Sequence, residues 1–208
     1  MSILNTGELP DRVAKMMAAE TAGECQVTFT LPKEPAYFKV QDGEYNGNGV
    51  HFNKKSQTRF SLLDKSMGVI YFSPTLPTSL KEVFQDEEVI DIMDLHKNFI
   101  AVLKPTRELR LFDEKQLAAW LGIKVGDLMG PKAVYEETQY LAQVLSSYAD
   151  GMQYLSRHTG EPCIVLWSDL IDGGGCLETV SVTSLAQYEH DQKSIKEILK
   201  FHLNILVM

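Results

Sequence analysis

The chain has few cysteines, no long hydrophobic run and no excess of basic residues. Its three cysteines, Cys25, Cys163 and Cys176, form no CxxC pair, so the sequence indicates neither a disulfide framework nor a zinc site. No stretch approaches the roughly 18 apolar residues of a membrane span, and the N-terminus lacks the basic flank and apolar core of a signal peptide. We therefore expect a cytoplasmic protein without a membrane segment; a secreted effector that leaves by another route is the alternative.

The charge balance restricts the class of ligand. With 20 Lys and Arg against 28 Asp and Glu, the formal net charge is -8, which argues against direct binding of nucleic acid or of anionic membranes. A local basic pocket for a small phosphate ligand is compatible with this charge. The five histidines are scattered without the i, i+4 spacing of a metal site, so no metal is expected.

The remaining composition is that of an ordinary globular protein. At 208 residues, with 44% hydrophobic and 23% charged residues, the chain is long enough to bury a sizeable core. The hydrophobic patterns predict a single α+β domain with five to eight strands. Strands are expected over residues 25–31, 38–40, 68–72, 89–93, 99–103, 150–156, 163–167 and 177–182, the last being the final strand. Helices are expected over residues 11–22, after Pro74, over 113–121, after Pro131 and after Ser194.

Three segments have the form of helix-capping boxes, and one loop is rich in glycine. The capping patterns pair Ser79 with Glu82, Asp113 with Gln116 and Ser194 with Glu197. Residues 42–49 contain three glycines, but a phosphate-binding loop of the dinucleotide type leads directly into a helix. Because residues 51–55 show no helix signal, an ordinary turn-rich loop is favoured.

Two stretches deliver polar side chains from apolar elements. In the first, a strand over 68–72 carries Tyr71, and the helical pattern after it carries Glu82, so the two side chains are expected to be close in space. In the second, Ser156 ends a strand-like segment. Together with Arg59, these residues form a set suited to an anionic, aromatic substrate and to stabilising a cation formed on it.

Each of these residues also has an ordinary structural interpretation. Glu82 can complete the capping box of Ser79, Arg59 can be a solvated surface arginine, and Tyr71 can be a core residue of its strand. Ser156 can satisfy the backbone at a strand end. No motif supplies the His and Asp partners of a serine nucleophile, so hydrogen bonding is the role that we assign to its hydroxyl.

The segments GVIYFSP, LKEVF and DGMQYLSR, with Arg59 upstream, resemble the RES domain, a family named for its Arg, Glu and Ser residues. The resemblance extends from about Tyr37 to about Trp167. The family has an aromatic residue followed by arginine at the start of its first strand, where this chain has Phe38 and Lys39. RES proteins are bacterial toxins that consume NAD. The resemblance thus implies an ADP-ribosyltransferase-like split β-sheet with flanking helices and an NAD cleft.

The resemblance also implies a reaction and roles for the candidate residues. The reaction is cleavage of the nicotinamide–ribose bond of NAD, its substrate, by phosphate or by water, which depletes the cell of NAD. Glu82 would stabilise the cationic ribose, Arg59 would bind the pyrophosphate, and Ser156 would hydrogen bond to Glu82 or to the substrate. The further candidates for contact with NAD are Lys39, Tyr71, Arg157 and His158.

A partner and two other functions follow from the same resemblance. The expected partner is an antitoxin with a helix-turn-helix part, or an immunity protein if the chain is a secreted effector. The alternatives are an ADP-ribosyltransferase that modifies a protein, and a catalytically silent protein-binding domain, which Lys39 in place of arginine favours. We expect a catalytic domain over 37–183, an N-terminal extension over 1–36 and a C-terminal helix over 184–208.

Overall fold

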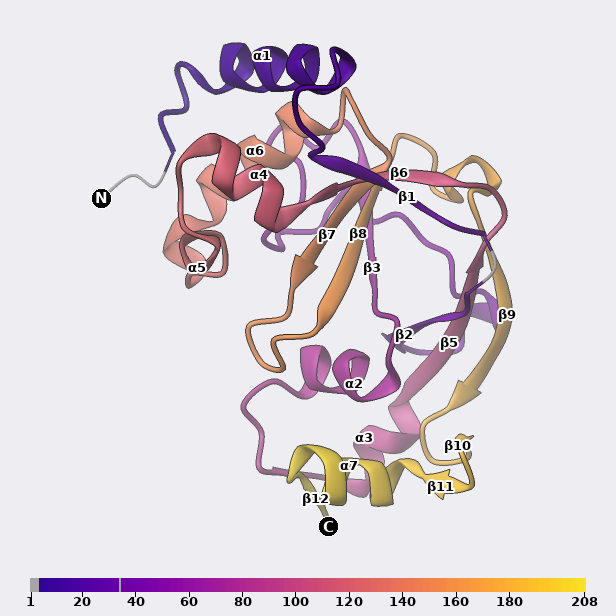
Figure 1. The fold of residues 1–208 in the computed structure, drawn as a ribbon. Helices are drawn as coiled ribbons and strands as arrows, with labels where there is room; N and C mark the ends of the chain where they lie inside the picture. Colours follow the sequence, from indigo (N-terminus) through magenta and orange to yellow (C-terminus); the bar gives the residue numbers. More distant parts are fainter. Residues whose placement is uncertain (1–3, 34) are drawn as a thin grey trace.

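Two sheets form the centre of the protein, and the helices gather at opposite ends of it (Figure 1). The computed structural model describes residues 4–33 and 35–208. The five-stranded sheet contains, in spatial order, β1 (Thr28–Leu31), β6 (Leu109–Asp113), β7 (Gly151–Leu155), β8 (Pro162–Ser168) and β3 (Gly68–Phe72). The three-stranded sheet contains β2 (Tyr37–Asp42), β5 (Asn98–Pro105) and β9 (Leu177–Ser184). The α+β class and the split sheet are thereby confirmed.

Neighbouring strands in both sheets are antiparallel except for β6 and β7, which are parallel. The two sheets meet where Phe38 of β2 and Ser73, just after β3, exchange backbone hydrogen bonds of 2.8 and 2.9 Å. Four two-residue strands pair separately: β4 (Val89–Ile90) with β12 (Leu206–Val207), and β10 (Glu189–His190) with β11 (Lys193–Ser194).

The helices form two groups that cover different cores. At one end of the five-stranded sheet are α1 (Leu9–Thr21), α4 (Glu114–Leu121), α5 (Val125–Leu128) and α6 (Tyr135–Leu145); near the three-stranded sheet are α2 (Leu76–Phe84), α3 (Ile92–Lys97) and α7 (Ile195–Leu203) (Figure 1). Short 3₁₀ turns are η1 (Tyr45–Gly47), η2 (Lys132–Val134) and η3 (Gly173–Gly175). In the part of the chain that the structure describes, no helix combines the length and apolar character needed to cross a membrane.

Burial on both faces explains why strand β3 is an unbroken apolar run. Val69 packs with the helices of the first group, whereas Ile70 and Phe72 pack between the two sheets. Side chains alternate across a strand, so a sheet covered on both faces needs apolar residues at consecutive positions. Strand β8 is buried from Cys163 to Trp167 for the same reason.

Two of the predicted helix caps are confirmed. The Asp113 carboxylate accepts hydrogen bonds from the backbone N–H groups of Lys115 (2.8 Å) and Gln116 (3.1 Å) at the start of α4. Ser194 and Glu197 form the reciprocal capping box of α7. These caps could be predicted because they depend only on residues three or fewer positions apart.

The third predicted capping box, Ser79 with Glu82, is wrong. Helix α2 begins at Leu76, with Pro77 in its first turn, where a missing N–H costs nothing. Ser79 therefore lies inside the helix, and its hydroxyl donates to the carbonyl oxygen of Phe38 at 2.5 Å. This hydrogen bond links α2 to strand β2, and Ser79 does not cap a helix.

Other differences from the sequence prediction concern the extent of strands. The predicted strand over 89–93 contains only Val89 and Ile90, because Asp91 caps helix α3 through a capping box with Asp94. The strand predicted over 25–31 begins at Thr28. Strand β6 was not predicted, and three two-residue strands follow β9, which the sequence suggested to be the last.

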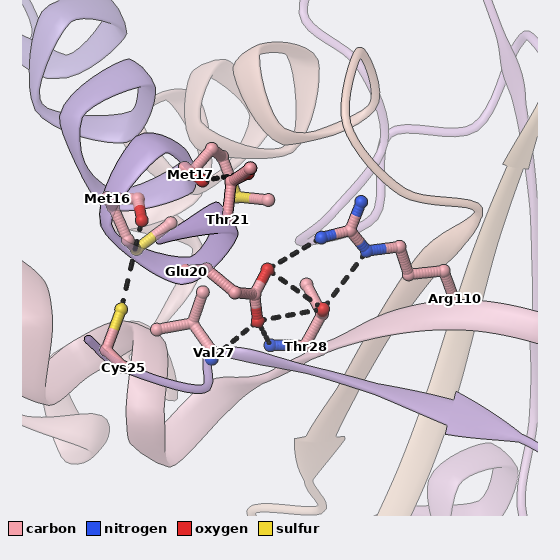
Figure 2. A network of polar contacts seen from close by, with 8 residues as sticks. All are labelled: Met16, Met17, Glu20, Thr21, Cys25, Val27, Thr28 and Arg110. Atoms are coloured by element: carbon pink, nitrogen blue, oxygen red, sulfur yellow. Dashed lines mark hydrogen bonds and ion pairs between the residues drawn. The ribbon is translucent and has the colours of Figure 1, made fainter. Parts of the chain in front are cut away.

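A partly buried carboxylate, that of Glu20, joins helix α1 to the edge of the five-stranded sheet (Figure 2). Glu20 Oε1 accepts from the backbone N–H groups of Val27 (2.8 Å) and Thr28 (2.7 Å), and Oε2 accepts from Arg110 Nη2 at 2.7 Å. Burial alone would raise the pKa of Glu20, but the hydrogen bonds from Thr28, Val27 and Arg110 outweigh it and lower the pKa.

All three cysteines are free thiols.

Candidate active site

A pocket of about 330 Å³ opens where the two sheets and α2 meet, a volume within the usual range for small-ligand sites. It contains the predicted residues from distant parts of the sequence. Tyr71 comes from β3, Glu82 from α2 and Lys39 from β2, and Arg59, Arg157 and His158 come from the connecting loops. Ser156 lies directly behind this wall, bonded to Glu82.

The charges around the pocket differ from those of the whole chain. Its wall carries one carboxylate, from Glu82, and four cationic side chains, from Lys39, Arg59, Lys132 and Arg157. A cavity with such an excess of positive charge concentrates anionic ligands even in a protein of net charge -8. The local chemistry therefore suits a phosphate-bearing ligand.

The carboxylate of Glu82 is oriented by the buried hydroxyl of Ser156. Ser156 Oγ donates to Glu82 Oε1 at 2.5 Å and accepts from the backbone N–H groups of His158 (3.1 Å) and Thr159 (3.2 Å). The hydroxyl of Ser156 therefore lies where it orients the carboxylate of Glu82. This short, charge-assisted contact fixes one carboxylate oxygen and leaves the other for a ligand.

Arg59 lies in the pocket wall and not on the surface. Only 9% of the residue is exposed, and its guanidinium lies over the ring of Tyr135, 5.6 Å from the ring centroid. Nη2 donates to the carbonyl oxygen of Gly130 at 3.2 Å, and Thr138 Oγ1 donates to the Arg59 carbonyl oxygen at 2.7 Å. The contacts with Gly130 and Tyr135 hold the guanidinium in place. The hydrogen bond to Gly130 uses one of its five N–H donors.

Tyr71 connects the pocket to the loop that carries Arg59. Its phenol oxygen accepts hydrogen bonds from Thr58 Oγ1 (2.8 Å) and from the backbone N–H of Phe60 (3.1 Å). The ring meets that of Tyr154 edge to face, with centroids 6.2 Å apart. Burial raises the pKa of Tyr71 to about 12, so the phenol stays protonated and its ring remains a neutral aromatic surface at physiological pH.

Lys39 is half-buried, and two hydrogen bonds anchor its ammonium group. Its ammonium group donates to Gln41 Oε1 at 3.0 Å and to the carbonyl oxygen of Gly49 at 2.8 Å. Burial lowers the pKa of Lys39 to about 8, which leaves the group mostly charged at neutral pH. An ammonium has three donors and cannot reproduce the forked geometry of arginine.

The last two predicted residues follow Ser156 and face the same pocket. Arg157 Nε donates to His158 Nε2 at 3.1 Å, and His158 Nδ1 lies 3.4 Å from Asp86 Oδ1 in the turn after α2. The short loop between β7 and β8 therefore contacts α2 through Ser156 and the turn after α2 through His158. Within residues 4–33 and 35–208, no group of three or more His, Cys, Asp or Glu is arranged to hold a metal ion.

A protein-family model described as "RES domain" matches residues 38–183, about two thirds of the chain. The chain belongs to the RES domain family. No curated protein matches its sequence. Among solved structures it is similar to a chain of the M. tuberculosis MbcT-MbcA toxin-antitoxin complex, with 11% sequence identity and a TM-score of 0.57, over 88% of this chain and 93% of that chain.

In this RES domain the residues that match the family's Arg, Glu and Ser are thus neighbours in the structure. Their catalytic roles stay predictions. Other pocket residues escaped the sequence analysis, among them Lys132 in η2, Tyr135 at the start of α6 and Tyr154 on β7. Tyr154 lies two positions before Ser156, so strand alternation could have placed it on the same side. Lys132 and Tyr135 carry no pattern that distinguishes them from surface residues.

The buried side chain of Glu114 supports the end of strand β7, which leads into Ser156. Strand β6 ends at Asp113, so it offers no carbonyl to the N–H of Leu155, and Glu114 Oε2 accepts that bond instead at 2.8 Å. Only 2% of Glu114 is exposed, and its Oε1 is buried without a hydrogen-bond partner among the described residues. Burial raises the pKa of Glu114 to about 7. Its contact holds the peptide that leads into Ser156.

Proposed function

We propose that this protein is a toxin enzyme that cleaves the bond between nicotinamide and ribose in NAD. The observation that carries the proposal is the Glu82 carboxylate, fixed by Ser156 in a pocket whose other charged groups are cations. Membership of the RES family and the likeness of the fold to a chain of a toxin-antitoxin complex support it. NAD fits this chemistry because it combines a pyrophosphate with a cationic aromatic ring.

The reaction needs little acid or base catalysis. The C–N bond breaks with its electron pair, nicotinamide leaves as a neutral molecule, and positive charge develops on the ribose ring. Glu82 stabilises that charge and accepts a hydrogen bond from a ribose hydroxyl. An oxygen of water or phosphate then bonds to the anomeric carbon, and with water a proton passes to the solvent.

The surrounding side chains have binding roles in this proposal. Arg59 binds the pyrophosphate, with Arg157 and His158 as additional contacts. Tyr71 offers its ring to the nicotinamide, and Lys39 contributes positive charge from β2. The segment 37–183 carries the activity, and the described residues of the two flanking segments, 4–33 with 35–36 and 184–208, pack on the same domain.

Nicotinamide release tests the enzyme proposal directly. Purified protein is incubated with NAD, with and without inorganic phosphate, and nicotinamide is separated by chromatography and quantified. Release that requires phosphate indicates phosphorolysis, and release without it indicates hydrolysis. No release under either condition refutes the proposal and favours the silent binding domain that Lys39 in place of arginine suggests.

The same preparation tests whether the protein is an ADP-ribosyltransferase instead. Transfer of ADP-ribose to a protein is detected by labelling with biotinylated NAD, which marks an acceptor only if the enzyme is a transferase.

The partner is proposed to be an antitoxin that blocks the pocket, with a helix-turn-helix part for binding DNA, or an immunity protein for a secreted effector. A cytoplasmic site of action agrees with NAD as the target.

A further inference from the structure

A second pocket of about 480 Å³ adjoins the one that contains Glu82. The two pockets share Lys39, Val40 and Tyr71 in their walls, so they meet at the middle of β2 and near the end of β3. The second pocket is closed by the glycine-rich loop and the segment after it, through Tyr45, Asn48, His51, Asn53 and Ser56. Neither the family match nor the predicted site residues assign a role to these side chains.

Tyr45 provides an exposed aromatic surface in this wall. The residue is 62% exposed, and its backbone has a φ of +49°, in the left-handed region that residues other than glycine seldom adopt. Its ring lies over Gly43, where an added Cβ would be 3.6 Å from the ring carbon Cζ. The exposed ring, set in the wall of a pocket, is available for stacking on a ligand.

Two asparagines on the same wall are fixed through their carbonyl oxygens. Asn48 Oδ1 accepts from the backbone N–H of Val50, and Asn53 Oδ1 accepts from that of Lys55, both at 2.9 Å. Each side chain therefore presents its NH₂ group as a donor for acceptors on a ligand. Ring nitrogens of a purine are such acceptors.

Lys39 lies between the two pockets and is charged. Two of its three ammonium protons are used in the contacts with Gln41 and Gly49, and the third is left for a ligand. In a dinucleotide the pyrophosphate lies between the two nucleosides. The two pockets with Lys39 between them match this order, one pocket for each nucleoside and the cation for the pyrophosphate.

We propose that the second pocket binds the adenosine half of NAD, with Tyr45 stacking on the adenine and Lys39 contacting the pyrophosphate. The proposal rests on the proposed function, which places the nicotinamide ribose beside Glu82 in the first pocket. Each pocket has a volume suited to a nucleoside-sized group. The loop over 42–49 then serves base recognition and not phosphate binding.

The test compares NAD with nicotinamide mononucleotide, which lacks the adenosine half. Tyr45→Ala is expected to raise KM for NAD about tenfold, the usual effect of losing one base–aromatic stack, without changing kcat. Its constants for nicotinamide mononucleotide are expected to equal those of the natural protein. Tyr45→Phe keeps the ring and is expected to retain the KM for NAD. Phe201→Ala, which removes a 72% exposed ring on α7, is the matched control.

Titration with ADP separates this proposal from the proposed function. ADP carries the adenosine and both phosphates, and calorimetry is expected to show binding that Tyr45→Ala weakens and Tyr45→Phe preserves. Equal KM changes for both substrates, or an unchanged KM for NAD, overturn the second pocket while leaving NAD cleavage intact. If the protein cleaves no NAD, the proposed function fails, and ADP binding that Tyr45→Ala leaves unchanged, or its absence, overturns the pocket as well.

Discussion

At the scale of single residues, the site depends on one hydroxyl that orients one carboxylate. Ser156 can do this because it is buried and because two backbone N–H groups occupy its acceptor side. Its proton then has a single direction, toward Glu82. A serine in a solvated loop would sample several rotamers and would hold the carboxylate less firmly.

Replacing Glu82 by Gln is expected to lower kcat for nicotinamide release by a factor on the order of 10²–10³. The amide keeps the shape but supplies no negative charge to the ribose. The thermal transition is expected to stay nearly unchanged, because Glu82 is only half-buried and does not cap α2. Glu87→Gln, an exposed glutamate in the turn after α2, is the control. Equal activity of both variants would contradict the assigned role.

Glu114 predicts a pH dependence of stability. In the folded protein the pKa of its carboxyl is about 7, so the group stays protonated up to about that pH. In the unfolded chain the pKa is near 4.5. The resulting stabilisation is full below the unfolded pKa and is lost as pH rises through 7. Glu114→Gln removes it, so the fall in unfolding free energy between pH 5 and pH 8 is expected to shrink by about 2 kcal/mol in urea titrations. An unchanged fall would contradict this prediction.

At the scale of helices and strands, the best predicted features are those with local causes. The cap of α4 by Asp113 depends on neighbours within three positions, and the sequence alone predicts it. Strand β6 was not predicted because it has only five residues and follows directly on the polar residues Thr106, Arg107 and Glu108. The burial of Arg59 was not foreseen either, since Gly130 and Tyr135 are far from it in sequence. For Ser156 the sequence predicts a hydrogen bond to Glu82 or to the substrate, and the structure contains the first of these.

The attachment of α1 to the sheet edge predicts acid sensitivity. Ionised Glu20 has a lowered pKa, so its stabilising effect is present above the unfolded pKa of 4.5 and is lost as pH falls through the folded value. Glu20→Gln is expected to reduce the free energy of unfolding by about 1–2 kcal/mol at pH 7 and by much less at pH 3. Chemical denaturation at both pH values measures this. A loss of the same size at pH 3 would mean that packing and not charge is responsible.

At the scale of the whole molecule, the pocket takes its wall from both sheets and from helix α2. Lys39 belongs to the three-stranded sheet, Tyr71 to the five-stranded sheet and Glu82 to α2. A ligand that contacts all three binds only when both sheets and the helix are assembled. Binding therefore stabilises the complete fold by mass action.

This assembly predicts a thermal shift with substrate. In the inactive Glu82→Gln variant, NAD at about 100 times its Kd is expected to raise Tm by roughly 5–10 °C. Scanning fluorimetry with increasing NAD measures the shift, and nicotinamide mononucleotide is expected to give a smaller one. The absence of any shift, in a protein whose natural form cleaves NAD, would show that the pocket is not the binding site.

The place of β3 at the edge of its sheet has a consequence for synthesis. Its neighbour in that sheet is β8, so Tyr71 is paired with Val165, 94 positions later in the chain. A ribosome-bound chain that has not yet emerged past β8 has neither this pairing nor the Ser156 hydroxyl next to Glu82. The pocket wall is therefore incomplete during translation until nearly the entire polypeptide is outside the ribosome.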